Sequence, residues 1–418
     1  MKKLIVLLLL GCFSSFAAMA TELPLGANIQ GLLNYAREHN HELAAIRYET
    51  DAASLRVQPA GALPDPVLRA ELTDITNQGT NKPPSFLPSQ VGGTRYLLMQ
   101  SVPWFGKLDL QREIAEAQVA GARGQTAVTW ADLSGKIKAA YAMHYYLSES
   151  IRLTRTTLDL TKRLEKIAQT RYANGLGTQQ EALSAQIEQT DLQTMLIGLD
   201  NEQHHVHASM NNLLSRPANT DLADPLQLRP IPSSTRLATL EDRLRAHNPQ
   251  LQVADASVSE AQRSRDLTYK NRYPGFTLGV APTQSGSTVK SWDLMVEFNL
   301  PLQQESRRSQ EHEAEAKMAA SAARQASLLN QVLSELSESV SGLETAQRTE
   351  TLIATRFLPQ AELSFQSALS GYETGKLDFS TLLDAQRQIL KARQQRIKAQ
   401  YDAQLRLAEI ERLIGEEL

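Results

Sequence analysis

Residues 171–175 carry the sequence RYANG, and a matching stretch, GYETG, stands 200 positions later at residues 371–375. The segments that follow also match at this distance, LSAQ at residues 183–186 and LDAQ at residues 383–386. In both copies a glycine interrupts a long run of residues that favour helix formation. Because glycine adopts positive φ readily, each stretch is predicted to turn one helix back against the next. The predicted unit is a helical hairpin that occurs twice.

The duplication extends over almost the whole chain. Residues 39–43 (HNHEL) match residues 247–251 (HNPQL) at an offset of 208, and Pro103 matches Pro301 at an offset of 198. A single order of motifs held through both halves favours internal duplication over chance matching of alanine- and leucine-rich helices.

Both halves have the same predicted order of elements. Residues 21–215 form the first repeat and residues 235–418 the second, and a linker rich in Pro, Asp and Ser joins them at residues 216–234. Each repeat begins with a helix, followed by two short strands, a very long helix, the glycine turn and another helix. The strands are predicted from a period of two in apolar residues, at about residues 66–75, 94–102, 274–282 and 291–300.

The strand at residues 291–300 alternates most clearly. Its apolar side chains fall on one face, and acidic or amide side chains occupy much of the other. Its length is close to the ~9–11 residues that a tilted strand needs to cross a bilayer. The side chains predicted to face lipid are Trp292, Leu294, Val296, Phe298 and Leu300.

Four strands from one chain cannot close into a barrel. In lipid, an open sheet would leave the N–H and C=O groups of its edges unpaired, at several kcal/mol each. Three copies would supply twelve strands, an even number within the range of known barrels. The alternative is a soluble sheet whose apolar face packs against the helices of the same chain.

The predicted helices are longer than a compact domain uses. Nothing stops a helix between Pro103 and Tyr172, and residues 305–357 are similar, with an interruption at Pro359. About 65 helical residues extend for about 100 Å, a length typical of coiled coils. We therefore predict a mainly α protein with a small β part, built from a duplicated strand pair and long coiled-coil helices.

These features, together with residues 102–107 (VPWFGK), resemble the TolC-type outer-membrane factor family of outer membrane efflux proteins, and most resemble its heavy-metal branch of the CzcC and CusC kind. The resemblance implies a homotrimer with a twelve-stranded transmembrane β-barrel continuous with a periplasmic α-helical barrel. It implies an exit duct of a tripartite efflux pump of the heavy-metal cation RND type, surrounded by outer-membrane lipid. The implied partners are a periplasmic adaptor (membrane fusion) protein and an inner-membrane RND transporter.

Two alternatives stay open at this point. The same duct could serve drugs or type I secretion, because the inner-membrane transporter selects the cargo. A protein of another class, a soluble periplasmic coiled-coil scaffold or adaptor, would instead pack its strands internally.

The resemblance also gives roles to the glycine turns, which would form the periplasmic mouth. Glu181 and Asp384 match positions where family members place acidic groups at the narrow entrance, and with Tyr372 they form the candidate constriction. In a trimer each acid would become a ring of three carboxylates that attracts cations. Lys376 stands where family members can carry a gating arginine. The residues that mark the tip turns are Tyr172, Gly175, Tyr372 and Gly375.

Residues 1–20 are predicted to be a signal peptide. Two lysines precede an apolar run at residues 4–10, and Ala18 and Ala20 frame a cleavage site. The alternative is a lipoprotein processing site that leaves Cys12 acylated at the mature N-terminus. Either pattern indicates export through the inner membrane.

Composition and motifs exclude several functions. The 43 basic and 46 acidic residues give a net charge of −3, without a long basic run, so nucleic acid is not an expected partner. A single cysteine excludes a disulfide framework, and no catalytic or cofactor motif points to an enzyme. The histidines at 204, 205 and 207 are interpreted as solvated or interface residues rather than metal ligands, since no carboxylate or fourth histidine stands at ligand spacing.

Overall fold

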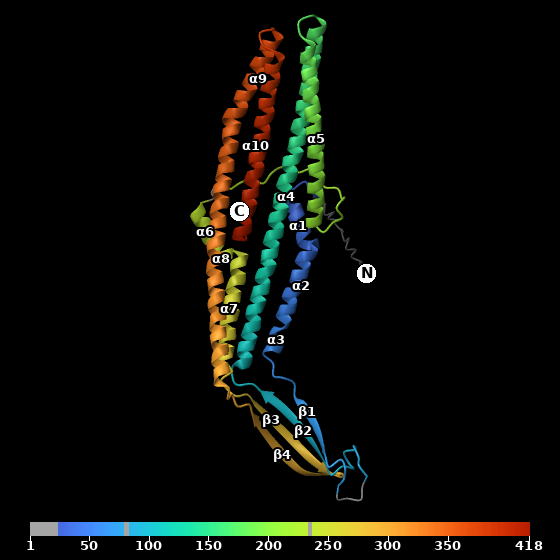
Figure 1. Cartoon of the computed structure of the whole chain (residues 1–418), viewed down its shortest axis with the longest axis vertical. Coiled ribbons are helices and arrows are strands. Elements are labelled where there is room, and N and C mark those ends of the chain that lie inside the picture. The colour runs from blue at the N-terminus through green and yellow to red at the C-terminus, as the bar shows by residue number, and fades with distance from the viewer. Residues whose placement is uncertain (1–23, 79–82, 233–235) are drawn as a thin grey trace, which may run out of the picture.

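The structure is a computed structural model that describes residues 24–78, 83–232 and 236–418. The predicted signal peptide, with Cys12, lies outside the described residues, as does the end of the predicted linker. The chain is strongly elongated (Figure 1): a sheet lies at one end, two helical hairpins end at the other, and the C-terminus lies near the middle.

The long helices connect these two ends. Helix α4 (Lys107–Ala173) contains 67 residues, which corresponds to about 100 Å at 1.5 Å per residue. It runs from the sheet to the first tip, where α5 (Gln179–Leu213) turns back along it. The second half repeats this plan with α8 (Gln304–Leu352), α9 (Leu358–Glu373) and α10 (Phe379–Ile414).

A π-helical turn, η1 (Ile353–Phe357), separates α8 from α9. Pro359 follows it in the first turn of α9. Proline lacks an N–H for the carbonyl four residues earlier, and its ring clashes with that carbonyl, whereas a wider turn relieves both problems. The helical path therefore continues through the position where the sequence predicted an interruption.

Shorter helices pack beside the long ones between the middle of the molecule and the sheet (Figure 1). The first half contributes α1 (Ile29–His39), α2 (His41–Leu55) and α3 (Val57–Ala60), and the second contributes α6 (Leu237–His247) and α7 (Pro249–Lys270). In the described part of the chain no helix is both long and apolar enough to span a bilayer.

Two asparagines hold equivalent places in the two halves. Asn40 caps α2, and its amide donates to the carbonyl oxygen of Leu213 at 2.9 Å. Asn248 caps α7, and its amide donates to the carbonyl oxygen of Leu413 at 2.6 Å. Asn40 and Asn248 belong to the segments that the sequence comparison paired, and Leu213 and Leu413 stand 200 positions apart, the same offset as the two tip segments. The duplication is thus repeated in the hydrogen bonds.

The four strands form one antiparallel sheet in the order β1-β2-β3-β4. Their bounds are Val67–Thr73, Gly93–Val102, Phe276–Ser285 and Thr288–Phe298. β2 pairs with β3, so the two halves of the duplication share the sheet. Two details correct the prediction. The sequence predicts that the third strand ends at about residue 282 and the fourth begins at about residue 291, but both extend to a tight turn at Gly286, with φ +65°. Leu300 lies beyond the end of β4.

The strand register separates an apolar face from a polar one. Leu68, Leu98, Val280 and Leu294 align across the four strands, and each is between 41% and 80% exposed. On the opposite face, Arg95 lies within 3.7 Å of Glu71 and 3.6 Å of Asp293. The helices of the chain leave the apolar face uncovered (Figure 1), which argues against the soluble alternative in which this face packs internally.

Candidate functional site

The tips of the two hairpins have the turn geometry that the repeated glycines predicted. Gly175 has φ +71° and Gly375 has φ +72°. At the first tip the N–H of Leu176 donates to the carbonyl oxygen of Arg171, and at the second Lys376 donates to Gly371, both at 2.8 Å. These bonds reach back over five residues and satisfy carbonyl groups at the helix ends. The positive φ of the glycine lets the chain reverse its direction in each hairpin.

The two tips are joined through Tyr372. Its side chain is only 2% exposed, and its hydroxyl donates to Glu181 Oε2 at 2.6 Å. Burial, followed by this bond to a carboxylate, raises the pKa of Tyr372 well above its ordinary value. Tyr372 therefore packs inside its own protomer and does not line the entrance through its side chain, which corrects the role expected for it. Tyr172, its repeat equivalent, is 51% exposed.

Arg171 completes this connection between the tips. Its guanidinium lies 4.8 Å from the centroid of the Tyr372 ring. Its nitrogens donate to the carbonyl oxygens of Leu176 in the first tip and Glu373 in the second, each at 3.1 Å. The sequence did not single out this arginine, although it opens the repeated RYANG stretch. Its counterpart in the second repeat is a glycine, so the duplication gave no signal for it.

Asp384 lies one turn into α10 and keeps its carboxylate accessible. The side chain is 67% exposed and lies 3.2 Å from Arg387. Arg387 also binds Glu188 of α5, at 2.6 Å, and that carboxylate is buried. The hydrogen bond to Glu188 raises the pKa of Arg387. In a trimer, each Asp384 carboxylate would therefore stand beside the positive charge of Arg387. The sequence analysis considered only the negative charge at this position.

The histidine run takes part in a contact that the sequence did not predict. His207 Nε2 lies 2.9 Å from Nε2 of His144, a fully buried residue of α4. Burial, and then the neighbouring His207, lower the pKa of His144 to about 4. Asp224 of the linker lies 3.6 Å from the same nitrogen. Across the described ranges no group of three or more His, Cys, Asp or Glu side chains is arranged to hold a metal ion.

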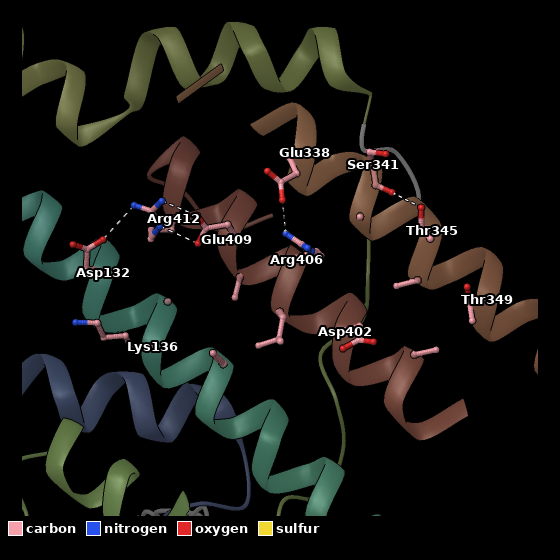
Figure 2. A pocket seen from close by; sticks show the side chains of 17 residues that line it. Asp132, Lys136, Glu338, Ser341, Thr345, Thr349, Asp402, Arg406, Glu409 and Arg412 are labelled. Atoms are coloured by element: carbon pink, nitrogen blue, oxygen red, sulfur yellow. Dashed lines mark hydrogen bonds and ion pairs between the residues drawn. The ribbon is translucent and has the colours of Figure 1, made fainter. Parts of the chain in front are cut away.

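A cavity of about 1140 Å³ lies midway along the molecule between α4, α8 and α10. Figure 2 shows its charged lining: Arg406 points toward Glu338 and Arg412 toward Asp132 and Glu409. Its arginines are paired with acids, and small apolar side chains supply much of the remaining lining. The cavity has no convergent set of groups that would grip one ligand.

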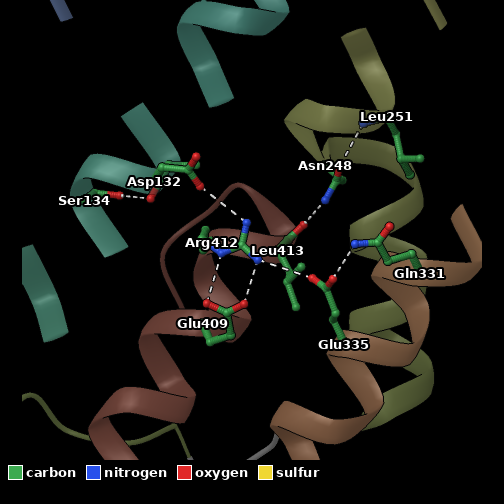
Figure 3. Close-up of polar contacts among 10 residues, drawn as sticks. Asp132, Ser134, Asn248, Leu251, Gln331, Glu335, Glu409, Arg412 and Leu413 are labelled. Atoms are coloured by element: carbon green, nitrogen blue, oxygen red, sulfur yellow. Dashed lines mark hydrogen bonds and ion pairs between the residues drawn. The ribbon is translucent and has the colours of Figure 1, made fainter. Parts of the chain in front are cut away.

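Arg412 fixes the helices around this cavity (Figure 3). It lies 2.6 Å from Glu409 on its own helix, and 3.4 Å from both Asp132 of α4 and Glu335 of α8. The hydrogen bond to Glu409 is the main reason why the pKa of Arg412 is raised. A half-buried guanidinium shared by three acids ties both repeats together at mid-length.

The fold and tips define the class of protein: an elongated, internally duplicated subunit with an uncovered apolar sheet at one end and two joined helical hairpins at the other. The sequence model described as "Outer membrane efflux protein" matches residues 32–215 and 240–416. The chain belongs to this family. It is an outer-membrane efflux channel protein whose helical part lies in the periplasm.

Individual relatives agree with this placement. The chain is 22% identical to the cobalt-zinc-cadmium resistance protein CzcC of Cupriavidus metallidurans, over 87% of this chain and 84% of CzcC. Its structure is similar to VceC of Vibrio cholerae, with a TM-score of 0.78 and 17% identity over 93% of this chain and 96% of VceC. The TM-score with CusC is 0.79, with 13% identity over 93% of this chain and 92% of CusC. The fold predicted from the sequence is confirmed.

Proposed function

We propose that this protein is the exit duct of a tripartite efflux pump of the RND type, and that its cargo is a heavy-metal cation. The observation that carries the cargo assignment is the 22% identity to CzcC over most of both chains. Residues 102–107 (VPWFGK), at the junction of sheet and helix, support the same branch of the family. The duct passes cations from the periplasm to the exterior, with residues 1–20 directing export.

The proposed assembly is a homotrimer. β1 and β4 are the two edges of the sheet, and each pairs with only one strand within the described residues. Unpaired backbone groups cost several kcal/mol each in lipid. Edge-to-edge pairing of three copies closes the sheet into a barrel and pairs these groups. Trp292, Leu294, Val296 and Phe298, all exposed, then face lipid. Leu300 lies two residues beyond the end of β4.

The helical tips are the proposed entrance and the contact for the periplasmic adaptor, which links the duct to an inner-membrane RND transporter. Asp384 supplies an accessible carboxylate for cations, balanced by Arg387. Glu181 accepts a hydrogen bond from the hydroxyl of Tyr372, and this bond keeps the two hairpins of one protomer together. Opening of the duct then requires the paired tips to move as a unit against those of the neighbouring protomers.

A deletion strain tests the cargo. We expect loss of this protein to lower the tolerated concentrations of cobalt, zinc and cadmium salts, and expression from a plasmid to restore them. Tolerance of a panel of hydrophobic drugs and the export of secreted proteins serve as comparison measurements. Unchanged metal tolerance with increased drug sensitivity, or with a secretion defect, would assign the duct to the alternative cargo.

A further inference from the structure

Three chain segments converge where the sheet meets the helices: the start of α4, the end of α7 and the start of α8 (Figure 1). Each brings basic residues, of which Lys107, Lys270 and Arg307 are the ones with observed contacts at the junction, while Arg308 beside Arg307 is exposed. Lys107 Nζ donates to the carbonyl oxygen of Tyr273 at 3.3 Å, and a Cβ placed on Gly106 would lie 3.7 Å from Lys270 Nζ. The cations therefore gather around one junction.

These cations make no direct ion pair. Among the described residues, none of the three forms an ion pair, and the side chain of Arg307 donates only to the carbonyl oxygen of Asn271. Its Nε is shielded from solvent and makes no hydrogen bond. Burial, and then the nearby Arg307, lower the pKa of Lys107. Asp109 and Glu305, in the first turns of α4 and α8, are exposed and do not neutralise the group. The hydrogen bond from Arg272, at 2.5 Å, is the main reason why the pKa of Glu311 is lowered, and Arg307 contributes to this shift. The like charges are thus compensated only in part.

Aromatic rings cover the sheet side of this basic group. Trp104 stacks on Tyr273, with ring centroids 5.2 Å apart. Phe105, 71% exposed, lies 6.3 Å from the ring of Phe276. Phe276 has the same strand parity as Val280 and so belongs to the apolar face of the sheet. Aromatic rings of this kind are typical of the level where a membrane protein meets lipid headgroups.

We propose that Lys107, Lys270 and Arg307 bind the phosphate of an anionic phospholipid in the leaflet of the outer membrane that faces the periplasm. Ammonium and guanidinium groups suit a phosphate oxygen. The lipid tails lie against the exposed apolar side chains that continue from the site, Phe105 and Phe298 with Leu300 and Leu302, of which the last is 80% exposed. The site anchors each subunit at a fixed depth.

The combination of features favours a lipid over free phosphate. A soluble anion would need the cations alone, and the apolar side chains beside them would gain nothing from its binding. The inference rests on the proposed channel, in which this face of the sheet meets lipid. The inference adds that the lipid headgroup is anionic and that Lys107, Lys270 and Arg307 select it.

Lipid titration followed by native mass spectrometry tests the site on the full-length protein in detergent. We expect wild type to retain phosphatidylglycerol in preference to phosphatidylcholine, and inorganic phosphate not to displace it. A cation at an anionic membrane surface contributes about fivefold in affinity, so the double variant Lys107→Gln with Arg307→Gln should bind phosphatidylglycerol at least about tenfold more weakly. Lys107→Arg should retain binding.

The matched control is Lys166→Gln with Arg356→Gln, two exposed cations, the first seven residues before the end of α4 at the tip and the second in η1. It should bind phosphatidylglycerol as wild type does. Equal weakening in both double variants, equal retention of the two lipids, or displacement by inorganic phosphate would overturn the site. A wild-type protein that stays soluble without detergent would overturn the proposed channel as well, whereas an intact detergent-dependent protein without lipid preference overturns this inference alone.

Discussion

At the scale of single residues, the buried hydroxyl of Tyr372 contributes to the contact between the two tips. Tyr372→Phe removes the donor to Glu181 and leaves the ring in place. A hydrogen bond to a charged group contributes about 1.5–3 kcal/mol, so the variant should loosen the contact between the two hairpins by roughly this amount. Amide hydrogen exchange, read by mass spectrometry at both tips, should become faster.

Tyr172→Phe provides the comparison, because Tyr172 occupies the equivalent place in the first repeat and is 51% exposed. It should leave exchange at the tips unchanged. If both tyrosine variants exchange like wild type, the Tyr372–Glu181 bond does not hold the hairpins together.

The buried histidine pair makes stability depend on pH. The pKa of His144 falls from an ordinary 6.5 to about 4 in the folded protein, so the unfolded chain binds a proton that the folded chain refuses between these values. The free energy of unfolding should therefore be highest above pH 6.5 and should fall as the pH is lowered toward 4. Asp224 opposes part of this effect, because its carboxylate favours the charged imidazole.

Thermal unfolding across this interval measures the slope. His144→Gln should flatten it, and His205→Gln, at an exposed position, should not. A slope that is identical in wild type and His144→Gln would show that other groups govern the acid response.

At the scale of elements, glycines with different backbone conformations should respond oppositely to the same substitution. Gly175 has φ +71° and Gly198 lies inside α5, and a Cβ at either position would meet no atom within 4 Å. Gly175→Ala should cost about 1–2 kcal/mol through backbone strain alone. Gly198→Ala should stabilise by about 0.5–1 kcal/mol, because alanine is the better helix former. Chemical unfolding of the two variants checks the sign, and two changes of equal sign would contradict the turn geometry.

The elements were predictable because their signals are local and occur twice. The strands, the long helices and the glycine turns each follow from spacing within a few residues, and duplication doubled the signal for Gly175 and Gly375. The π-helical turn was not predictable in this way. Pro359 indicated a break, but a π-helical turn accommodates the proline, and α8, η1 and α9 all pack along α10.

Side-chain contacts between different helices could not be predicted from the sequence. His144 and His207 are 63 positions apart, and Tyr372 and Glu181 are 191 apart. No periodicity links such residues, since their meeting depends on how two long helices are aligned. For the same reason the sequence selected Glu181, Tyr372 and Asp384 as one group, whereas the structure pairs the first two with each other and the third with Arg387.

At the scale of the whole molecule, the proposed channel requires the two faces of the sheet to meet different surroundings. Val296 and Glu297 are neighbours in β4 and point to opposite faces. The same substitution at both positions therefore compares its cost on the face proposed to meet lipid with its cost on the face proposed to line the lumen. Val296→Arg should cost about 2–4 kcal/mol if the position lies near the bilayer midplane, and less toward the interface. Glu297→Arg should change stability little. Urea unfolding of the protein reconstituted in lipid vesicles measures both, with detergent-solubilised protein as the reference. Since a soluble sheet would expose the two positions alike to water, equal tolerance of arginine at Val296 and Glu297 would reject the membrane placement of this face.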